Sequence, residues 1–595
     1  MREATTVLDV LRERGRRGLP LERLYRQLFN PQLYLLAYGR LYSNKGAMTP
    51  GPDGETVDGM SLAKIGRVID ALRHERYRFK PVRRTYIPKK NGTKKRPLGL
   101  PSWSDKLVGE VVRLLLEAYY EPQFSDRSHG YRPERGCHTA LSEVVNRWPG
   151  TTWFIEGDVS DCFGSLDHDI MLSTLAGNIH DGRFLRLLRN MLQAGYLQDW
   201  VWHATLSGAP QGGVASPILS NIYLDRLDSY VENVLIPEYT RGTGRAPNPD
   251  YQEVEKQLMR ARRRGDRPAV RALRKQRRCL PSKDPNDPGF RRLRYVRYCD
   301  DHLLGFTGPK AEAEEIKIRL AAFLREELKL ELSQEKTLIT HARTGAARFL
   351  GYQITVQHAD HKVTGKGRSI NGIVGLRVPR DVIKAKCGPY LKLGKPERLN
   401  QMVNEDDHTI VRTYGAQYRG LVEYYQLAGD VYRLNRLEWV MKTSMLKTLA
   451  CKHDSTVTQM ADRYKTTITT PSGPRRCFEV SVEREGRKPL VARFGGIPLR
   501  RKRNAVLTDH APRPVNVRRK ELVTRLRAGR CELCKQADGT AEVHHVRKLA
   551  NLDRPGRPQP AWDQLMAKRR RKTLIVCADC HAAIHGGRPT ATATQ

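Results

Sequence analysis

The chain has 595 residues, and its 105 Lys and Arg outnumber its 64 Asp and Glu to give a formal net charge of +41. This length exceeds what one hydrophobic core supports, so it excludes a single-domain protein and predicts roughly three to five modules. A positive excess of this size along a whole chain is uncommon without a polyanionic partner, and it indicates nucleic-acid binding.

The sequence also predicts a compartment. No apolar run approaches the roughly 18 residues that a membrane-spanning helix needs, and the N-terminal segment is charged throughout, unlike a signal peptide. Of eleven cysteines, four form two Cys-x-x-Cys pairs near the C-terminal end, a usage typical of a reducing compartment with a metal site. We therefore expect a soluble protein of the bacterial cytoplasm or of an organelle, with no membrane partner and no disulfides.

The first part of the chain predicts a helical extension followed by a mixed α+β domain. Residues 1–75 carry helical apolar spacing that is interrupted by a Gly- and Pro-rich loop at 44–59. Short apolar strands then alternate with helices through residues 76–365, which predicts an α+β fold. The charged stretch at about 240–294 has hardly any apolar periodicity, so we expect a basic insertion on the surface.

Three further regions follow. Residues 366–470 place apolar side chains such as Leu421, Tyr425 and Ala428 at helical spacing, which predicts a helical bundle. Residues 471–528 are rich in Pro, Gly and Arg, a composition typical of a basic linker or a loosely folded DNA-binding region. Residues 529–595 form a compact module rich in Cys and His.

Three acidic residues stand out in the α+β domain. Asp300 and Asp301 lie between two strand-like runs in RYVRYCDDHLLGF, and Asp158 follows the apolar strand in WFIEGDV. An Asp-Asp pair alone is more often only a turn. Nucleotidyl transfer, however, needs carboxylates that converge from separate strands on two divalent cations. We therefore expect these three residues to hold two Mg²⁺ ions and to carry polymerase chemistry.

Further segments occur in the same order as in one known family. They are NKGAMTPG, IPKKNGTKKRPLGLPSWSDK, FSDRSHGYRPERGCHTAL, APQGGVASPILSN, ELSQEKTLIT and FLGYQI. With the acidic motifs, they resemble the reverse transcriptases of group II intron-encoded proteins almost from end to end. The resemblance implies a right-hand polymerase with fingers and palm at 76–365, a helical thumb or maturase domain X at 366–470, and intron RNA as a partner.

The resemblance also implies roles for residues around the acidic motifs. Asp158 and Asp300 bind the catalytic metals, with Asp301 beside them. Phe163 takes the place of the aromatic gate against a ribose 2′-hydroxyl, the alternative being an ordinary core residue. Cys299 stands where the family usually has Ala; both are small, so we expect little steric change.

Four more residues match positions that contact the incoming nucleotide. Lys89 and Arg96 match the residues of the fingers that neutralise the triphosphate, a task for which Lys90, Lys94 and Lys95 are alternatives. Gln211 would contact the nucleotide. Lys336 would protonate or stabilise pyrophosphate, the alternative being an exposed, solvated charge. In the thumb, Tyr424 or Tyr425 would stack on an RNA base or fill the core, and no thumb residue is assigned.

The Cys-rich module predicts a structural metal. Two Cys-x-x-Cys pairs about forty residues apart suit a closed tetrahedral Zn²⁺ site that stabilises a domain with little hydrophobic core. The predicted ligands are Cys531, Cys534, Cys577 and Cys580.

Histidines in the same module predict a second, open metal site. His581 and His585 are four residues apart, so on a helix both rings point to one face, and His544 completes the set. An open divalent metal activates a scissile phosphate, while a neutral imidazole takes a proton from water. His545 is the general base that we expect.

This arrangement resembles the HNH, or ββα-metal, endonucleases. The middle Asn of that family has no clear counterpart, because Lys572 or Thr573 occupies its region. Together, the modules predict an intron-mobility enzyme that binds intron RNA, assists splicing, nicks target DNA and extends the cut strand with deoxynucleoside triphosphates. The alternatives are a splicing maturase without enzymatic activity and a host-adopted reverse transcriptase in repair or defence. The sequence does not distinguish a monomer from a homodimer.

Overall fold

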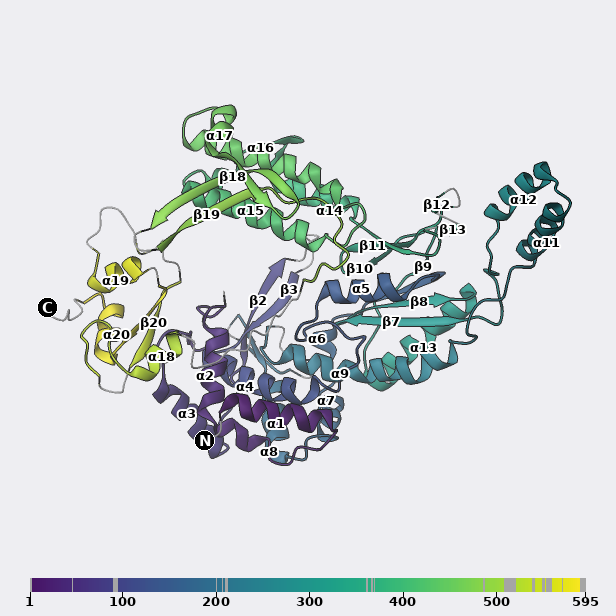
Figure 1. Ribbon diagram of the computed structural model, residues 1–595. Helices are drawn as coiled ribbons and strands as arrows, with labels where there is room; N and C mark the ends of the chain where they lie inside the picture. Colours follow the sequence, from purple (N-terminus) through teal and green to yellow (C-terminus); the bar gives the residue numbers. More distant parts are fainter. Residues whose placement is uncertain are drawn as a thin grey trace.

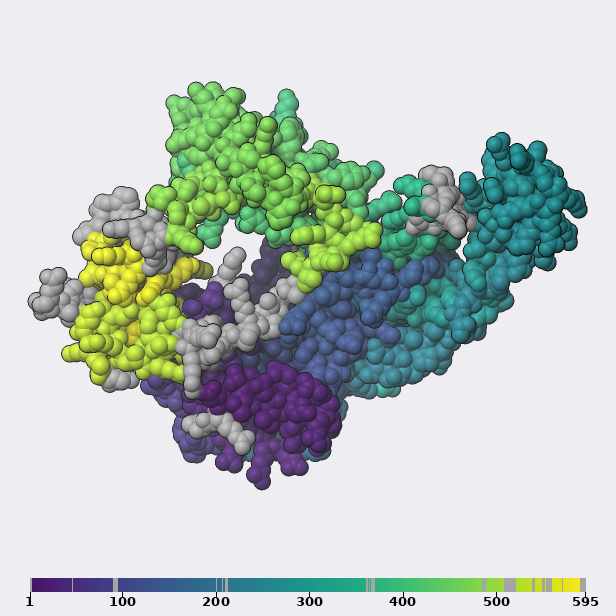
Figure 2. Space-filling view, viewed as in Figure 1, coloured from purple at the N-terminus to yellow at the C-terminus, as the bar shows by residue number. Residues whose placement is uncertain are grey.

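The computed structural model describes residues 3–44, 46–88, 95–199, 201–205, 207–208, 212–359, 362–364, 367–368, 370–484, 487–507, 521–537, 541–547, 552, 559–569 and 571–588. They form an α+β protein whose C-terminal module lies beside the N-terminal helices (Figure 1). The space-filling view shows the molecule hollowed between the green part of the chain and the purple and blue part below it (Figure 2). None of the described helices combines the length and the apolar character needed to cross a membrane.

Three α-helices of the N-terminal extension, which the helical apolar spacing predicts, pack with one α-helix of the following α+β domain. They are α1 (Ala4–Arg16), α2 (Pro31–Leu41), α3 (Leu62–Arg73) and α4 (Trp103–Tyr120). The Asn30 side chain caps α2 by accepting a hydrogen bond from the Gln32 amide, and Ser61 caps α3 in the same way. A Cβ at Gly15 would meet the Tyr119 carbonyl oxygen at 1.9 Å, so only glycine permits the close packing of α1 on α4.

The central sheet carries both acidic motifs. Its strand order is β7-β8-β4-β9, formed by β7 (Arg292–Tyr298), β8 (Asp301–Thr307), β4 (Trp153–Gly157) and β9 (Ile339–His341). All neighbours are antiparallel, and Ile155 and Phe306 are fully buried in the main core. The expected strands around the acidic residues, and the hairpin between β7 and β8, are therefore confirmed.

A second sheet lies on the N-terminal side of the central sheet. Its order is β3-β2-β5-β6, formed by β2 (Val82–Pro88), β3 (Lys95–Leu100), β5 (Tyr196–Gln198) and β6 (Val201–His203). Strands β2 and β3 pair along their whole length, from Arg83 opposite Leu100 to Pro88 opposite Lys95. This hairpin lies opposite the helical part of the chain shown in green (Figure 1).

The basic insertion is more regular than its composition indicates. It contains a helical hairpin, α11 (Pro249–Arg263) and α12 (Arg267–Cys279), which projects away from the rest of the molecule (Figure 2). Asn248 and Asp266 cap the two helices. Val254 and Leu258 are buried in α11 while α12 buries no residue, so the insertion lies at the surface as expected.

The predicted helical bundle is confirmed as a helical block. It comprises α14 (Arg380–Cys387), α15 (Asp407–Tyr424), α16 (Asn435–Lys452) and α17 (Val457–Tyr464). Tyr425 is only 4% exposed and packs on Tyr352 with ring centroids 5.0 Å apart. The Tyr424 hydroxyl donates to the Leu350 carbonyl oxygen at 2.6 Å. These contacts favour the core alternative over base stacking for both rings.

The expectation of a loosely folded linker at 471–528 is wrong for its first part. Strands β17 (Lys465–Thr470), β18 (Gly473–Arg484) and β19 (Arg487–Gly495) form an antiparallel sheet that packs on α15. Phe494 is 1% exposed there. Alternating apolar residues in CFEVSV and VARF favour strands, and the Arg-rich composition obscured this pattern. Residues 508–520 lie outside the described part of the chain.

The C-terminal module has a ββα core. Strands β20 (Glu542–His545) and β21 (Thr573–Val576) precede helix α20 (Ala578–His585), and α18 (Glu521–Ala528) and α19 (Ala561–Arg569) complete the module. Strand β1 (Met60–Ser61), from the N-terminal part, adds to the edge of β20. The module is therefore joined to the N-terminal part by backbone pairing.

Candidate active sites

The central sheet brings the three predicted acidic residues together. Asp158 follows β4 directly, and Asp301 begins β8; since Gly157 pairs with His302, Asp158 comes opposite Asp301. The two carboxyl groups are close enough that Asp158 contributes to the raised pKa of Asp301. Asp300 occupies the two-residue turn between β7 and β8, because Tyr298 pairs with Asp301.

The electrostatics of this site favour cation binding. Burial raises the pKa of Asp301, and repulsion from Asp300 and Asp158 raises it further. Burial likewise raises the pKa of Asp300, again with repulsion from Asp158. The raised pKa values of Asp300 and Asp301 indicate that the site lacks sufficient positive charge, and divalent cations would supply it.

Lys336 supplies part of that charge. Its Nζ lies 2.5 Å from Asp158 Oδ2, and Ser333, in the same turn, donates its amide to the Asp158 carbonyl oxygen at 2.8 Å. The hydrogen bond to Asp158 raises the pKa of Lys336. The Lys336 side chain is 66% exposed, but it is paired with the acidic site, unlike a solvated lysine.

The oxygens of the three carboxylates are farther apart than the ligand atoms around a single ion. Two other groups of side chains among the described residues have ligand atoms that all lie within 4.8 Å of one another, whereas Asp158, Asp300 and Asp301 do not form such a group. Two ions about 3.5–4 Å apart spread their ligands over a wider region than one ion does. Carboxylate oxygens are also the ligands that Mg²⁺ prefers, so the residues fit a pair of such ions.

A buried ion pair, which sequence reasoning missed, supports the turn. Arg297 is fully buried, and its Nε and Nη2 donate to the two carboxylate oxygens of Asp228 at 2.8 and 2.6 Å. Its Nη1 donates to the Cys299 carbonyl oxygen at 2.9 Å and to Asn221 Oδ1 at 3.2 Å. The guanidinium group therefore fixes the backbone immediately before Asp300. An arginine at an inward position of an apolar strand was the available signal.

Cys299 has a tighter environment than its size indicates. Its backbone is left-handed, with φ 57°, a conformation that is uncommon for residues other than Gly. A Cβ at Gly130 would lie 2.3 Å from Cys299 Sγ, so the thiol packs directly on that glycine. Burial raises the pKa of the Cys299 thiol, which keeps it protonated beside Asp300.

Phe163 and Arg96 both lie near the acidic site. Phe163, in the short helix α6 (Cys162–Ser165), is half-buried and packs edge-on against Tyr131 with ring centroids 6.4 Å apart. Arg96, on β3, is exposed and close enough to lower the pKa of Asp300. The partial exposure of Phe163 favours the gate over the core alternative. Lys89 and Gln211 lie outside the described residues.

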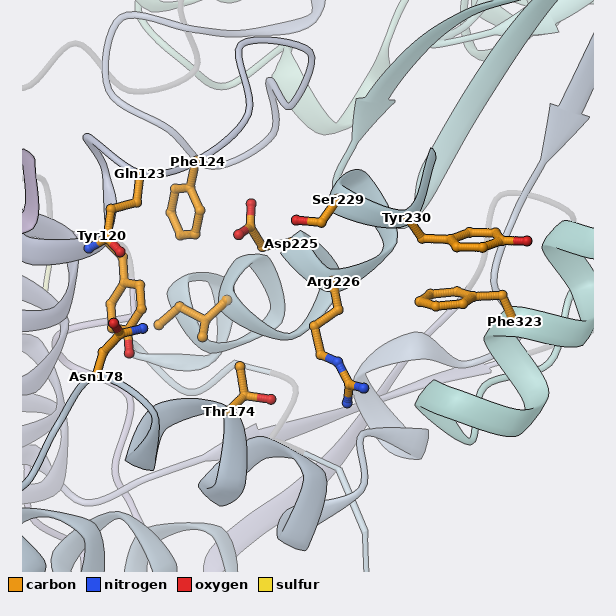
Figure 3. Close-up of a pocket in the computed structure, with 11 residues that line it drawn as sticks. Tyr120, Gln123, Phe124, Thr174, Asn178, Asp225, Arg226, Ser229, Tyr230 and Phe323 are labelled. Carbon is orange, nitrogen blue, oxygen red and sulfur yellow. The ribbon is translucent and has the colours of Figure 1, made fainter. Parts of the chain in front are cut away.

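A hollow on the central domain is a different site from the three carboxylates. It holds about 400 Å³ and is lined by residues such as Tyr120, Asn178, Asp225 and Phe323 (Figure 3). Burial, together with repulsion from Asp228, raises the pKa of Asp225 to about 6. No residue with a predicted catalytic or binding role lines this hollow, so it does not belong to the acidic site.

The four predicted zinc ligands converge in the C-terminal module. The four Sγ atoms all lie within 4.8 Å of one another; they belong to Cys531, Cys534, Cys577 and Cys580. All four are free thiols, and the Sγ atoms of Cys534 and Cys577 are 3.7 Å apart. Four sulfur ligands with no room for another are typical of a structural Zn²⁺ site.

The three predicted histidine ligands also converge, and an unexpected residue joins them. Nitrogens of His544, His581 and His585 form a second group within 4.8 Å, together with a carboxylate oxygen of Asp58. Glu542 Oε2 lies 2.6 Å from His581 Nδ1, which leaves Nε2 of that ring directed to the group. Nitrogen and oxygen donors in this number fit a divalent metal.

His545 lies apart from these ligands. Neighbouring residues of a strand point to opposite faces, so His544 faces the metal group and His545 faces the N-terminal helices. His545 Nε2 is 3.1 Å from the Tyr38 hydroxyl oxygen, and the residue is 5% exposed. Burial lowers the pKa of His545 to about 4. The imidazole is therefore neutral, as a general base must be, but covered in this arrangement.

The position of the missing Asn is occupied by a threonine. Thr573 pairs with His545 across β20 and β21, and its carbonyl oxygen accepts a hydrogen bond from Arg525 Nη2 at 3.1 Å. Lys572 comes just before β21, and its carbonyl oxygen accepts a hydrogen bond from the Val546 amide at 3.0 Å. The His545 ring is instead held by the Tyr38 hydroxyl.

Comparison with known families gives three matches in chain order. A family described as reverse transcriptase (RNA-dependent DNA polymerase) matches residues 87–354. A family described as type II intron maturase matches 375–476. A family described as AI2M/AI1M-like, HNH endonuclease matches 531–581. These segments contain the central sheet, the helical block, the four cysteines and two of the three metal-facing histidines, His544 and His581.

Similar proteins cover almost the whole chain. The group II intron-encoded protein LtrA of Lactococcus lactis subsp. cremoris is 38% identical, over 94% of this chain and 95% of that protein. The putative COX1/OXI3 intron 1 protein of Saccharomyces cerevisiae is 32% identical, over 93% of this chain and 68% of that protein. Protein YkfC of Escherichia coli is 34% identical, over 57% of this chain and 84% of that protein.

Proposed function

Because this chain belongs to the group II intron-encoded proteins, we propose that it copies its intron RNA into a DNA site that it has itself nicked. The reverse transcriptase and HNH regions give it RNA-directed DNA polymerase and DNA endonuclease activity, and the maturase region gives it a role in splicing. The proposed partners are intron RNA, target DNA and deoxynucleoside triphosphates, and the net charge of +41 suits all three.

The proposed polymerase is laid out as a right hand. The central sheet is the palm, the β3-β2-β5-β6 sheet with its helices forms the fingers, and the helical block is the thumb. The observation that carries this proposal is the meeting of Asp158 and Asp301, side by side on β4 and β8, with Asp300 in the adjoining turn. The hollow between the green and blue parts in Figure 2 is where we place the template and primer.

Each residue around the carboxylates has a proposed task. Bound Mg²⁺ ions supply the charge that activates the primer hydroxyl and stabilises the leaving pyrophosphate. Asp158 and Asp300 hold these ions. Arg96 binds the triphosphate as a fixed cation, Lys336 donates a proton to pyrophosphate, and Phe163 fills the space beneath the sugar that a 2′-hydroxyl needs. Lys89 and Gln211 are assigned to triphosphate and nucleotide contacts on the resemblance alone.

The proposed nuclease binds two metal ions, one structural and one catalytic. The four cysteines hold a structural Zn²⁺, and His544, His581 and His585 hold the divalent ion that stabilises the departing phosphate oxygen. His545 accepts the proton of the attacking water. In the arrangement described here His545 is covered by Tyr38, so nicking requires the module to part from the N-terminal helices at this point.

Primer extension tests the polymerase assignment. On an RNA template, Asp300→Asn should lower extension of a DNA primer by roughly 10³-fold, because the amide no longer offsets the charge of a metal ion. Asp169→Asn is the matched control, since Asp169 is an 85% exposed carboxylate on the same domain, and it should extend like wild type. Equal extension by Asp300→Asn and wild type would overturn the assignment and favour a maturase without polymerase activity.

A further inference from the structure

Asp58 comes from the opposite end of the chain from the histidines that it meets. It lies in the Gly- and Pro-rich loop that precedes β1, and no sequence motif pairs it with the C-terminal module. Its Oδ2 is 2.7 Å from His585 Nε2, and its Oδ1 is 3.4 Å from both His544 Nδ1 and His581 Nε2. One carboxylate thus faces three imidazoles.

His544 indicates that something is bound within this group. The residue is 4% exposed, and neither of its ring nitrogens has a hydrogen-bond partner among the described residues. A buried imidazole is costly when its nitrogens make no hydrogen bond and Nδ1 has only a longer ion-pair contact with Asp58, and a metal bond satisfies it. His581 Nε2 and His585 Nε2 are only 3.2 Å apart, a spacing that suits two nitrogens directed at one ion.

The loop that carries Asp58 is held firmly. Val57 and Met60 are fully buried on either side of it, and the Gly59 amide donates to the Val543 carbonyl oxygen at 3.1 Å. The His545 amide donates to Asp58 Oδ1 at 2.7 Å. These backbone hydrogen bonds therefore hold the carboxylate facing the histidines, as a metal ligand requires.

We propose that Asp58 is the fourth ligand of the nuclease metal, so that one ion is shared between the N-terminal part and the C-terminal module. This inference rests on the proposed nuclease metal site. Four protein ligands close a metal site, whereas a catalytic metal keeps a position for water or substrate. The shared ion therefore holds the nuclease in a resting state, and loss of the Asp58 ligand opens the position that a scissile phosphate needs.

Cobalt binding to the full-length protein tests this inference without any activity assay. The protein is first loaded with one equivalent of Zn²⁺, which the four thiolates take up, and is then titrated with Co²⁺, whose visible absorption is strong with four ligands and weak with six. Wild type should bind one further Co²⁺ with strong bands. Asp58→Asn should bind it at least about tenfold more weakly and with weaker bands, because a ligand is lost.

Two further variants make each outcome decisive. Asp58→His replaces one ligand by another and should restore strong bands at a shifted wavelength, which a merely structural role for Asp58 would not produce. Asp53→Asn changes a carboxylate of the same loop that pairs with Lys80, and it should behave like wild type. His585→Ala should lose the Co²⁺ that wild type binds with strong bands.

Three results would contradict the inference. If Asp58→Asn keeps wild-type affinity and band strength while His585→Ala loses the ion, the nuclease metal stands but Asp58 is not a ligand. If Asp58→His fails to recover the bands that Asp58→Asn loses, Asp58 acts only by holding the loop. If wild type binds no Co²⁺ with strong bands after the Zn²⁺ loading, the proposed nuclease metal site is wrong. Asp58 then only pairs with charged histidines.

Discussion

The two metal-binding regions of this protein are assembled in different ways. The carboxylates of the central sheet come from neighbouring strands, so one hairpin and one strand end suffice to bring them together. The histidines of the C-terminal module are joined by Asp58, which is 527 positions away from His585 in the sequence. The first site is complete within one sheet, whereas the second closes only when two parts of the chain pack against each other.

The largest expected effect tests whether the two sites work independently. His545→Ala should lower nicking of target DNA by about 10³-fold, because water then has no general base, and it should leave primer extension unchanged. A supercoiled-plasmid nicking assay run beside primer extension measures both. Tyr38→Phe is the control, since it removes only the hydroxyl that contacts His545 and should still nick. Loss of extension together with nicking would show that the sites depend on each other.

The next effect tests the self-sufficiency of the central sheet. Asp228→Ala leaves the Arg297 guanidinium buried without a counter-charge, so it should lower the free energy of unfolding by about 3–5 kcal/mol. The turn before Asp300 should shift as well, and extension should fall in the variant that remains folded. Thermal unfolding and primer extension measure the two effects. Asp225→Ala, one turn earlier on α9 (Ser216–Tyr230), should cost only about 1 kcal/mol. Similar losses of stability and of primer extension in both variants would show that Arg297 does not position the turn before Asp300.

A smaller effect tests the sugar selectivity of the same site. Phe163→Ala opens space beside Tyr131, so the preference for deoxynucleotides over ribonucleotides should fall by about 10- to 100-fold. Single-nucleotide incorporation with each triphosphate gives the ratio. Phe163→Tyr keeps a ring of the same shape and should retain the preference. An unchanged ratio in Phe163→Ala would favour the core alternative for this residue.

The sequence predicted features that depend on neighbouring residues better than contacts between distant parts of the chain. The β7–β8 hairpin, the helix of His581 and His585, and the helical block follow from apolar periodicity and residue spacing, which act over a few residues. The sheet at 473–495 was missed because many arginines masked an alternating pattern. Asp58 had no local signal at all, since an acid in a Gly- and Pro-rich loop is ordinarily only a turn residue. Its partners are set by tertiary packing.

The smallest expected effect follows from the shared metal and runs in the opposite direction to the others. With enough divalent metal to saturate the weakened site, Asp58→Asn should raise the nicking rate several-fold, because the ion gains an open position and the module is held less tightly over His545. His585→Ala should abolish nicking under the same conditions, and Asp53→Asn should nick like wild type. The rate is measured on supercoiled DNA over a series of metal concentrations. If Asp58→Asn nicks more slowly than wild type at every concentration, Asp58 supports the reaction itself, and the closed site is then a working arrangement instead of a resting one.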